Sequence, residues 1–185
     1  DRAIAAHWDF GHWLSYYSGS PVVSHPFQDA ASHETLKMFC SESEDDFHQY
    51  MKKHPVPYLL VEGPNRRVRK WLSSLGRNLD RYFLPKTDAQ GKAYLQASND
   101  TLKLQSLRFF VRHGQNLEGV FPSNWRLLFV SPFSNPDDPS MSALKLFENV
   151  PGAILQGKTK AKSLTLEAKI NTFNETFTFI QEARP

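Results

Sequence analysis

The chain has 185 residues, of which 40% are hydrophobic and 13% are aromatic. This length and composition exclude intrinsic disorder over most of the chain and allow it to bury a core of its own. The longest apolar runs have the size of a strand, so a membrane-spanning helix is excluded. The net charge of +3 is small, and we expect no nucleic-acid partner. A single cysteine, Cys40, excludes an internal disulfide.

The first part of the chain, over residues 1–120, shows signals of both helix and strand. Residues 1–28 are rich in aromatic side chains and are broken into turns by glycine and proline. Further on, Glu44, Asp45 and Asp46 favour the positive end of a helix dipole, and proline ends that helix. We predict helices at 11–17, 33–39, 43–53, 64–75 and 101–113, and a buried strand at 56–62.

The helix at 64–75 has the clearest pattern in the chain. Its apolar residues recur at helical spacing, at Val68, Trp71, Leu72 and Leu75, and Gly76 is well placed to end it. The other face carries arginines and a lysine. We interpret that face as solvated, although anionic lipid headgroups or a pyrophosphate would also suit it near a membrane.

After residue 120 the pattern becomes that of strands. We predict strands at 125–130 and 143–150, followed by a hairpin whose two runs flank residues 172–175. The sequence therefore predicts a mixed α/β or α+β fold. We divide it into a mixed domain over residues 1–120 and a β-rich C-terminal part over residues 121–185. The last strand meets the chain end without a turn, so we expect this β-rich part to be truncated.

The segment His7-Trp8-Asp9-Phe10-Gly11 is the most informative one. It resembles the WWDYG signature of the catalytic subunit of oligosaccharyltransferases, the STT3/AglB/PglB family. His7 stands in place of the first tryptophan and Phe10 in place of tyrosine. The continuation GHWLSYYSGSPVVSHPF, the strand VPYLLVE and the later runs at 124–133 and 146–156 resemble the same family. The resemblance covers nearly the whole chain.

The resemblance implies a parent that is a polytopic membrane glycosyltransferase. Such an enzyme takes a lipid-linked oligosaccharide and transfers the glycan to asparagine in Asn-x-Ser/Thr. Asp1 would lie just outside the bilayer, and this domain would lie on the extracytoplasmic side. A divalent cation, Mn or Mg, is expected in the parent, held mostly by its membrane domain. In this chain we therefore expect no cofactor, no metal ligand and no catalytic residue, and we expect the chain to be inactive alone.

The signature also has a direct physical interpretation. The Asp9 carboxylate can accept the hydroxyl proton of an acceptor Ser or Thr, and the Trp8 indole can donate to the same oxygen. Such a pocket rejects an isostere without the hydroxyl, because its own polar groups would stay unpaired. His7 and Phe10 are expected to support this pocket, and Gly11 to allow a tight turn behind it. A structural interpretation stays open, because Asp between aromatic residues often forms a cap or a turn.

The family has a second element that contacts the acceptor, a short helix after the strand equivalent to VPYLLVE. Its place here is taken by residues 64–72, without the family's usual motif. Val68 and Leu72 are the residues there that could supply apolar contacts. The alternative, that both belong to the core, follows from their helical spacing.

Two other function classes stay open. The first is a free-standing extracytoplasmic module that binds glycan or protein. The second is a small metal-dependent hydrolase built on His7, Asp9, His12 and His25. Cys40 lies in a predicted amphipathic helix without a histidine partner, which argues against a nucleophile. Acceptor sequons at Asn99 and Asn174 are common by chance, and we infer no self-glycosylation from them.

Overall fold

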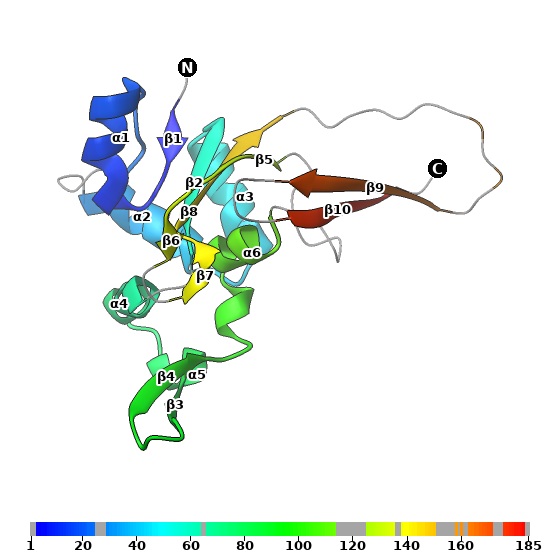
Figure 1. Cartoon of the computed structure of the whole chain (residues 1–185). Helices are drawn as coiled ribbons and strands as arrows, with labels where there is room; N and C mark the ends of the chain where they lie inside the picture. Colours follow the sequence, from blue (N-terminus) through cyan, green and yellow to red (C-terminus); the bar gives the residue numbers. More distant parts are fainter. Residues whose placement is uncertain are drawn as a thin grey trace.

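A computed structural model describes residues 3–24, 29–63, 66–113, 125–135, 138–150, 158, 160, 163–171 and 176–183. It has the α+β fold that the sequence predicts, with a four-stranded sheet at its centre (Figure 1). Among the described residues, no helix is both long enough and apolar enough to cross a bilayer.

The central sheet joins strands from distant parts of the chain. Its order is β1 (Ile4–Ala5), β2 (Tyr58–Glu62), β8 (Leu144–Asn149) and β5 (Trp125–Val130). Strand β1 runs parallel to β2, whereas β2, β8 and β5 pair antiparallel. The predicted strands at 56–62, 125–130 and 143–150 are thus present. The sheet takes strands from both sides of residue 120, and our division of the chain there stays a prediction.

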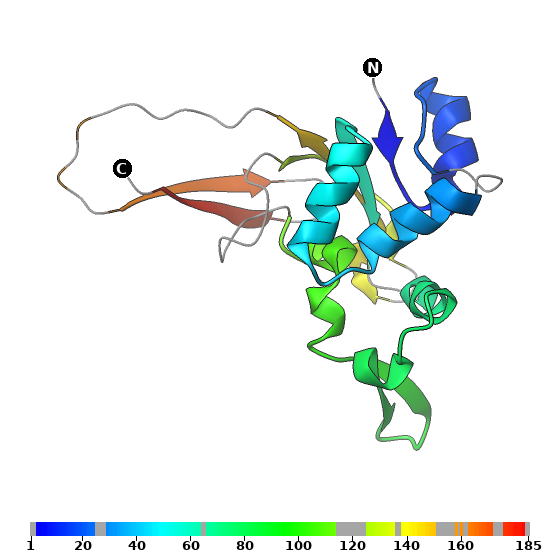
Figure 2. The ribbon, with the colours of Figure 1, turned by 180° about the vertical axis from the view of Figure 1, so that it is seen from behind.

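The two faces of this sheet carry different helices because side chains alternate along each strand. Leu59 and Val61 of β2 point to one face, where helices α2, α3 and α6 pack and form the largest core cluster (Figure 2). Leu60 points to the other face, where Leu14 packs from α1. The bounds of these helices are α1 Gly11–Ser18, α2 Asp29–Phe39, α3 Glu44–Lys53 and α6 Gln105–Val111.

A second cluster forms around helix α4 (Arg66–Ser74), which the sequence predicts from its apolar stripe. Val68, Trp71 and Leu72 are all buried there, together with residues of α2 and α6. The helix ends as predicted. Gly76 adopts a left-handed φ of 66°, and the Arg77 amide donates to the Leu72 carbonyl over 2.9 Å.

The predicted helix at 101–113 is in fact two elements. A 3₁₀ turn, η2 (Thr101–Lys103), is separated from α6 by Leu104, whose ψ of 135° is extended. The Gln105 amide donates to the Ser41 carbonyl, whereas a continuous helix would pair it with the Thr101 carbonyl, and this bond stabilises the break. The predicted end at Gly114 lies outside the described residues.

Three small antiparallel pairs complete the described structure. The pair β9 (Leu164–Asn171) and β10 (Thr176–Ala183) confirms the predicted hairpin, whose connection at 172–175 lies outside the described residues. The sequence did not predict the pair β3 (Phe83–Thr87) and β4 (Ala93–Ala97), which follows the short helix α5 (Leu79–Tyr82). Strands β6 (Ser134–Asn135) and β7 (Asp138–Ser142) form the third pair.

Candidate functional site

The five residues of the signature form one turn between the central sheet and helix α1. After β1, His7 caps the 3₁₀ turn η1 (Trp8–Phe10), and Gly11 begins α1 directly behind it. The Asp9 amide donates to Nδ1 of His7 over 3.4 Å, and the Phe10 amide donates to the His7 carbonyl over 3.0 Å. The backbone at Gly11 is right-handed, with φ −54° and ψ −48°, so the turn does not need the conformational freedom of glycine.

Trp8 and Asp9 both reach the surface from this turn. Trp8 is 38% exposed, and the Asp9 side chain is 34% exposed. Phe10 beside them is half-buried and packs against the cluster on the α1 side of the sheet. A carboxylate, an indole and apolar ring surface therefore lie within three consecutive residues, and the carboxylate is open to solvent.

His7 takes a different position from its two neighbours. It is 3% exposed and stacks on the Trp71 indole, with ring centroids 4.3 Å apart. Burial, and secondly the charge of Arg67, lower the pKa of His7 to about 3, so the ring is neutral. Its Nδ1 faces Asp9, and its Nε2 has no hydrogen-bond partner among the described residues. The ring thus supports the turn from inside rather than presenting a donor at the surface.

Arg67 is a member of this site that the sequence did not single out. Its Nη1 lies 3.8 Å from Oδ2 of Asp9 and 3.1 Å from Oε1 of Glu62. Its guanidinium carbon lies 5.8 Å from the centroid of the Phe10 ring. Arg67 immediately precedes the apolar stripe of α4, and only the fold shows that this edge of the helix meets η1.

Val68 and Leu72, the candidates for a second acceptor contact, lie in the core. Their side chains are 1% and 0% exposed, in the cluster that also holds Trp71. Their burial agrees with the alternative that both residues belong to the core. A direct contact of either residue with a peptide stays a prediction, and the burial argues against it. The residues of α4 that reach the signature are Arg67, through Asp9 and Phe10, and Trp71, through His7.

Comparison with known proteins shows which proteins the chain is similar to. No protein-family model matches the chain. Dolichyl-phosphooligosaccharide-protein glycotransferase 2 of Archaeoglobus fulgidus is 32% identical over 61 residues, which are 33% of this chain and 10% of that protein. Glycotransferase 1 of the same organism is 33% identical over 61 residues, with the same coverage. The chain is a relative of the STT3/AglB oligosaccharyltransferases. The resemblance that the signature indicates is thereby confirmed.

Solved structures of this family share the fold. The A. fulgidus oligosaccharyltransferase AglB, in complex with an inhibitory peptide and a dolichol-phosphate, matches with a TM-score of 0.69 at 14% identity. That match covers 100% of this chain and 31% of AglB. The C-terminal globular domain of a second A. fulgidus oligosaccharyltransferase matches with a TM-score of 0.55 at 22% identity, over 80% of this chain and 81% of that domain. The chain therefore has the fold of the family's C-terminal globular domain and spans about a third of AglB.

Residues that could bind a metal ion do not cluster in the described part of the chain. No group of three or more His, Cys, Asp or Glu side chains there is arranged to hold a metal ion. His25, one of the four residues of the hydrolase alternative, lies outside the described residues. Cys40 is buried, and its burial raises the pKa of the thiol to about 12, so the reactive thiolate does not form at neutral pH.

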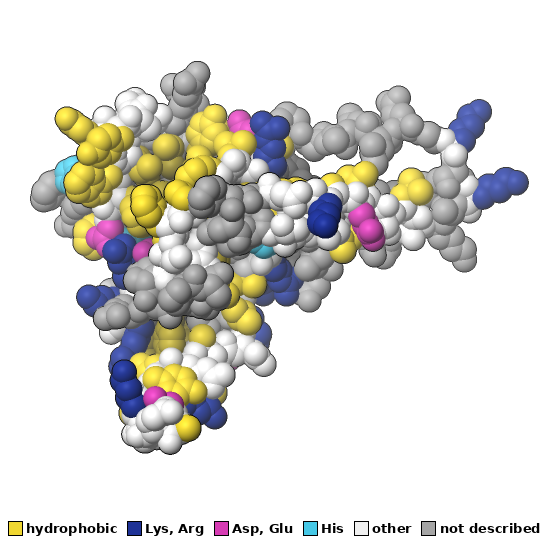
Figure 3. Space-filling model, viewed as in Figure 1, with side chains coloured by type: hydrophobic (Ala, Val, Ile, Leu, Met, Phe, Trp, Pro, Cys, Tyr) yellow, Lys and Arg dark blue, Asp and Glu magenta, His cyan; other side chains and the backbone are white. Residues whose placement is uncertain are grey.

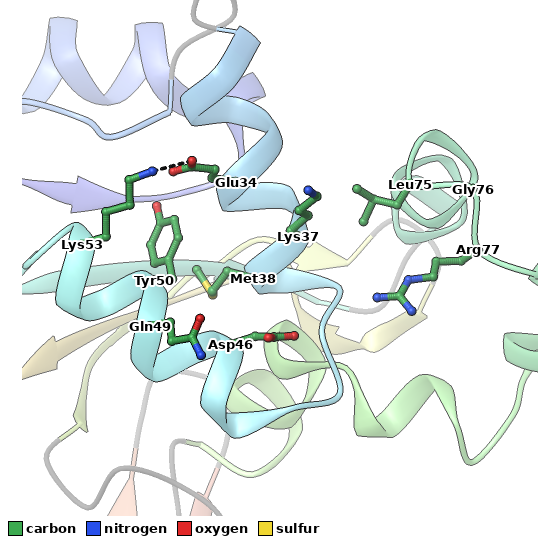
Figure 4. A pocket seen from close by; sticks show the side chains of 10 residues that line it. All are labelled: Glu34, Lys37, Met38, Asp46, Gln49, Tyr50, Lys53, Leu75, Gly76 and Arg77. Atoms are coloured by element: carbon green, nitrogen blue, oxygen red, sulfur yellow. Dashed lines mark hydrogen bonds and ion pairs between the residues drawn. The ribbon is translucent and has the colours of Figure 1, made fainter.

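A cavity of about 640 Å³ opens elsewhere, between α2, α3 and the end of α4 (Figure 4). None of the signature residues lines it. Its Glu34 carboxylate is engaged by Lys53 over 2.6 Å and by His54 over 2.9 Å. These contacts lower the pKa of Glu34 to about 2, so it remains an ion-pair acceptor rather than a proton donor. The cavity holds no arrangement suited to acid–base or nucleophilic catalysis among its lining residues.

Proposed function

We propose that this chain is the acceptor-recognition domain of a membrane oligosaccharyltransferase. The parent enzyme would transfer a lipid-linked glycan to asparagine in Asn-x-Ser/Thr sequons, with this domain on the extracytoplasmic side of the membrane. The observation that carries the proposal is the turn η1, where Trp8 and Asp9 are presented together at the surface. The partial exposure of Asp9 supports a role in binding a ligand over a role as a turn former alone.

The chemistry of this pair suits a small alcohol side chain. The hydroxyl of Ser or Thr has one proton to donate and two lone pairs to accept. Asp9 would accept the proton in a charge-assisted bond, and the Trp8 N–H would donate to the oxygen. Phe10 would offer apolar surface to the methyl group of Thr. A valine in the same place would cover the carboxylate and the indole without offering either of them a hydroxyl partner, which is the basis of the discrimination.

Residues behind the pair would fix its position. The stack of His7 on Trp71 ties the turn to α4, and Arg67 lies within 3.8 Å of the carboxylate from the same helix. A recognition pair held by packed neighbours loses little conformational entropy when the peptide binds. Holding the sequon in this way would act on glycan transfer through positioning of the acceptor asparagine.

The comparisons support a peptide and a lipid as substrates of the parent. One matching AglB structure is described with an inhibitory peptide and a dolichol-phosphate, and another is tethered to an acceptor peptide that contains the NVT sequon. A further AglB structure is described with zinc and sulfate. We infer that the divalent cation and the lipid-linked donor of this protein bind to parts of the parent outside this chain.

The test is a peptide titration followed by NMR of the Trp8 indole N–H. An Asn-x-Thr peptide in millimolar excess should shift this signal, and an Asn-x-Val peptide of the same length should not. The indole of Trp125, which is buried in the largest core cluster, serves as the internal control. An equal response of Trp8 to both peptides would count against a hydroxyl pocket.

A further inference from the structure

The outward face of helix α1 is aromatic and carries no charge. Trp13, Tyr16 and Tyr17 are 62%, 81% and 73% exposed, the largest exposures among the described Trp and Tyr side chains. The helix sequence GHWLSYYS contains no Asp, Glu, Lys or Arg. In the space-filling view, exposed hydrophobic side chains gather over α1, at the upper left (Figure 3).

The three rings form one cluster rather than three separate side chains. Trp13 and Tyr17 are stacked with ring centroids 5.8 Å apart and an angle of 4° between their planes. Tyr16 meets Tyr17 edge to face, with centroids 5.0 Å apart. The opposite side of α1 is already used, because Gly11 is buried and Leu14 packs against the sheet. The aromatic cluster is therefore an outer surface that contributes nothing to the core of this domain.

The other helices show what a solvated face looks like in this protein. Helices α2, α3 and α4 all carry charged side chains on their exposed faces, such as Lys37, Asp45 and Arg69. A contiguous cluster of exposed aromatic rings, in contrast, marks a surface that is covered in the working protein. Among these four helices, only α1 lacks charged side chains on its exposed face.

The chemistry of the cluster favours a lipid headgroup region as its cover. Trp and Tyr have an apolar body and one polar group, and they concentrate at the boundary between bilayer and water. Aliphatic side chains, which a dry protein interface or the acyl region would favour, are absent from the exposed face of α1.

We propose that α1 lies on the lipid headgroup region of the bilayer, with Trp13, Tyr16 and Tyr17 inserted. This inference rests on the proposed function, in which the parent is anchored in a membrane. It adds a role to α1. Because Trp8 and Asp9 directly precede this helix, its contact with the bilayer would hold the hydroxyl pocket at a fixed height above the membrane.

The test is binding of the chain to vesicles of phosphatidylcholine with a minority of phosphatidylglycerol. We expect the wild-type chain to sediment with the vesicles. A variant with Trp13→Ser, Tyr16→Ser and Tyr17→Ser should bind about ten-fold more weakly or worse. The matched control replaces three other exposed residues, Tyr94→Ser, Leu128→Ser and Phe133→Ser, and should bind as the wild type does. Lipids brominated near the headgroup should quench tryptophan fluorescence in the wild type, and Trp13→Phe should remove that quenching.

Three outcomes of the vesicle experiments would overturn the inference. These are no sedimentation of the wild type, equal loss of binding in the patch variant and the control, or quenching that persists in Trp13→Phe. A response of Trp13 fluorescence to a water-soluble oligosaccharide without vesicle binding would also overturn it and would indicate a glycan platform. The peptide titration at Trp8 needs no lipid. It therefore reports on the proposed function separately, and the patch variant should retain its response to Asn-x-Thr.

Discussion

The imidazole of His7 stacks on the indole of Trp71, with ring centroids 4.3 Å apart and planes inclined by 24°. This contact joins the turn that bears Trp8 and Asp9 to the buried stripe of α4. The first position of the signature therefore has a structural task in this chain, whereas the second and third positions reach the surface. A histidine suits that task because it offers a flat ring for stacking and a nitrogen that accepts the Asp9 amide proton.

His7→Ala should destabilise the chain by about 2–4 kcal/mol, because it removes a fully packed ring and the acceptor that caps η1. The measurement is urea unfolding of both proteins under the same conditions. His33→Ala is the matched control, since His33 lies exposed on α2, and it should change stability by less than about 0.5 kcal/mol. A loss for His7→Ala as small as that of the control would show that the stack contributes little.

The stability of the chain should fall with pH below the ordinary pKa of histidine. In the folded chain the pKa of His7 is lowered from 6.5 to about 3. Between these two pH values the ring of His7 is protonated in the unfolded chain and neutral in the folded chain. This stabilisation is complete above pH 6.5 and is lost progressively as the pH falls towards 3. Between pH 6.5 and 5 the loss from this residue should be about 2 kcal/mol. Urea unfolding at each pH measures it.

His7→Phe separates this effect from other titrating groups. Phenylalanine keeps a flat ring against Trp71 and cannot be protonated. The free energy of unfolding of the variant should therefore fall less between pH 6.5 and 5 than that of the wild type, and the difference is the contribution of His7. The lowered pKa of Glu34, from 4.5 to about 2, acts in a lower range and should remain in the variant. An unchanged pH profile between 6.5 and 5 would mean that His7 is not buried as a neutral ring.

Arg67→Gln should raise the pKa of His7 while leaving it below 6.5. The charge of Arg67 is the second cause of the lowered pKa, and burial, the larger cause, remains in the variant. NMR titration of the His7 ring protons measures the change. Arg69→Gln is the control, because Arg69 is exposed on the same helix and is not among the causes of the shift. A pKa of His7 that responds equally to both substitutions would point to a general charge effect rather than the contact at η1.

Much of the fold follows from local patterns in the sequence. The apolar stripe of Val68, Trp71 and Leu72 gives α4 its buried face, and Gly76 ends the helix as its position predicts. The alternation before and after residues 172–175 gives the hairpin of β9 and β10. These elements could be predicted because each one is decided by periodicity or by a capping residue of its own.

Other features depend on contacts that no local pattern reveals. Leu104 interrupts the predicted helix at 101–113, and the Gln105 amide that follows it donates a hydrogen bond to the Ser41 carbonyl. The hairpin of β3 and β4 turns at Asp88, whose carboxylate accepts the amides of Gln90 and Lys92. Both strands are almost wholly exposed, so their residues do not alternate between a buried and an exposed face as in a half-buried strand.

The candidate site was predictable in part. The resemblance to the family's signature identifies the turn, and the chemistry of an indole beside a carboxylate suggests a hydroxyl ligand. The inward position of His7 could not be predicted, because it depends on Trp71, more than sixty residues further along the chain. The contact of Arg67 with Asp9 could not be predicted either, because it also joins distant parts of the chain. A run of basic residues on a helix is most often solvated, so nothing in the sequence singles out Arg67.

Asp9→Asn tests the central claim most directly, when the affinities of Asn-x-Thr and Asn-x-Val peptides for both proteins are measured by NMR titration. The wild type should prefer the threonine peptide, and Asp9→Asn should lose about ten-fold of that preference while its affinity for the valine peptide changes little. Glu167→Gln, an exposed carboxylate change on β9, should leave the preference unchanged. The same preference in the wild type and in Asp9→Asn would contradict a hydroxyl pocket built on this carboxylate.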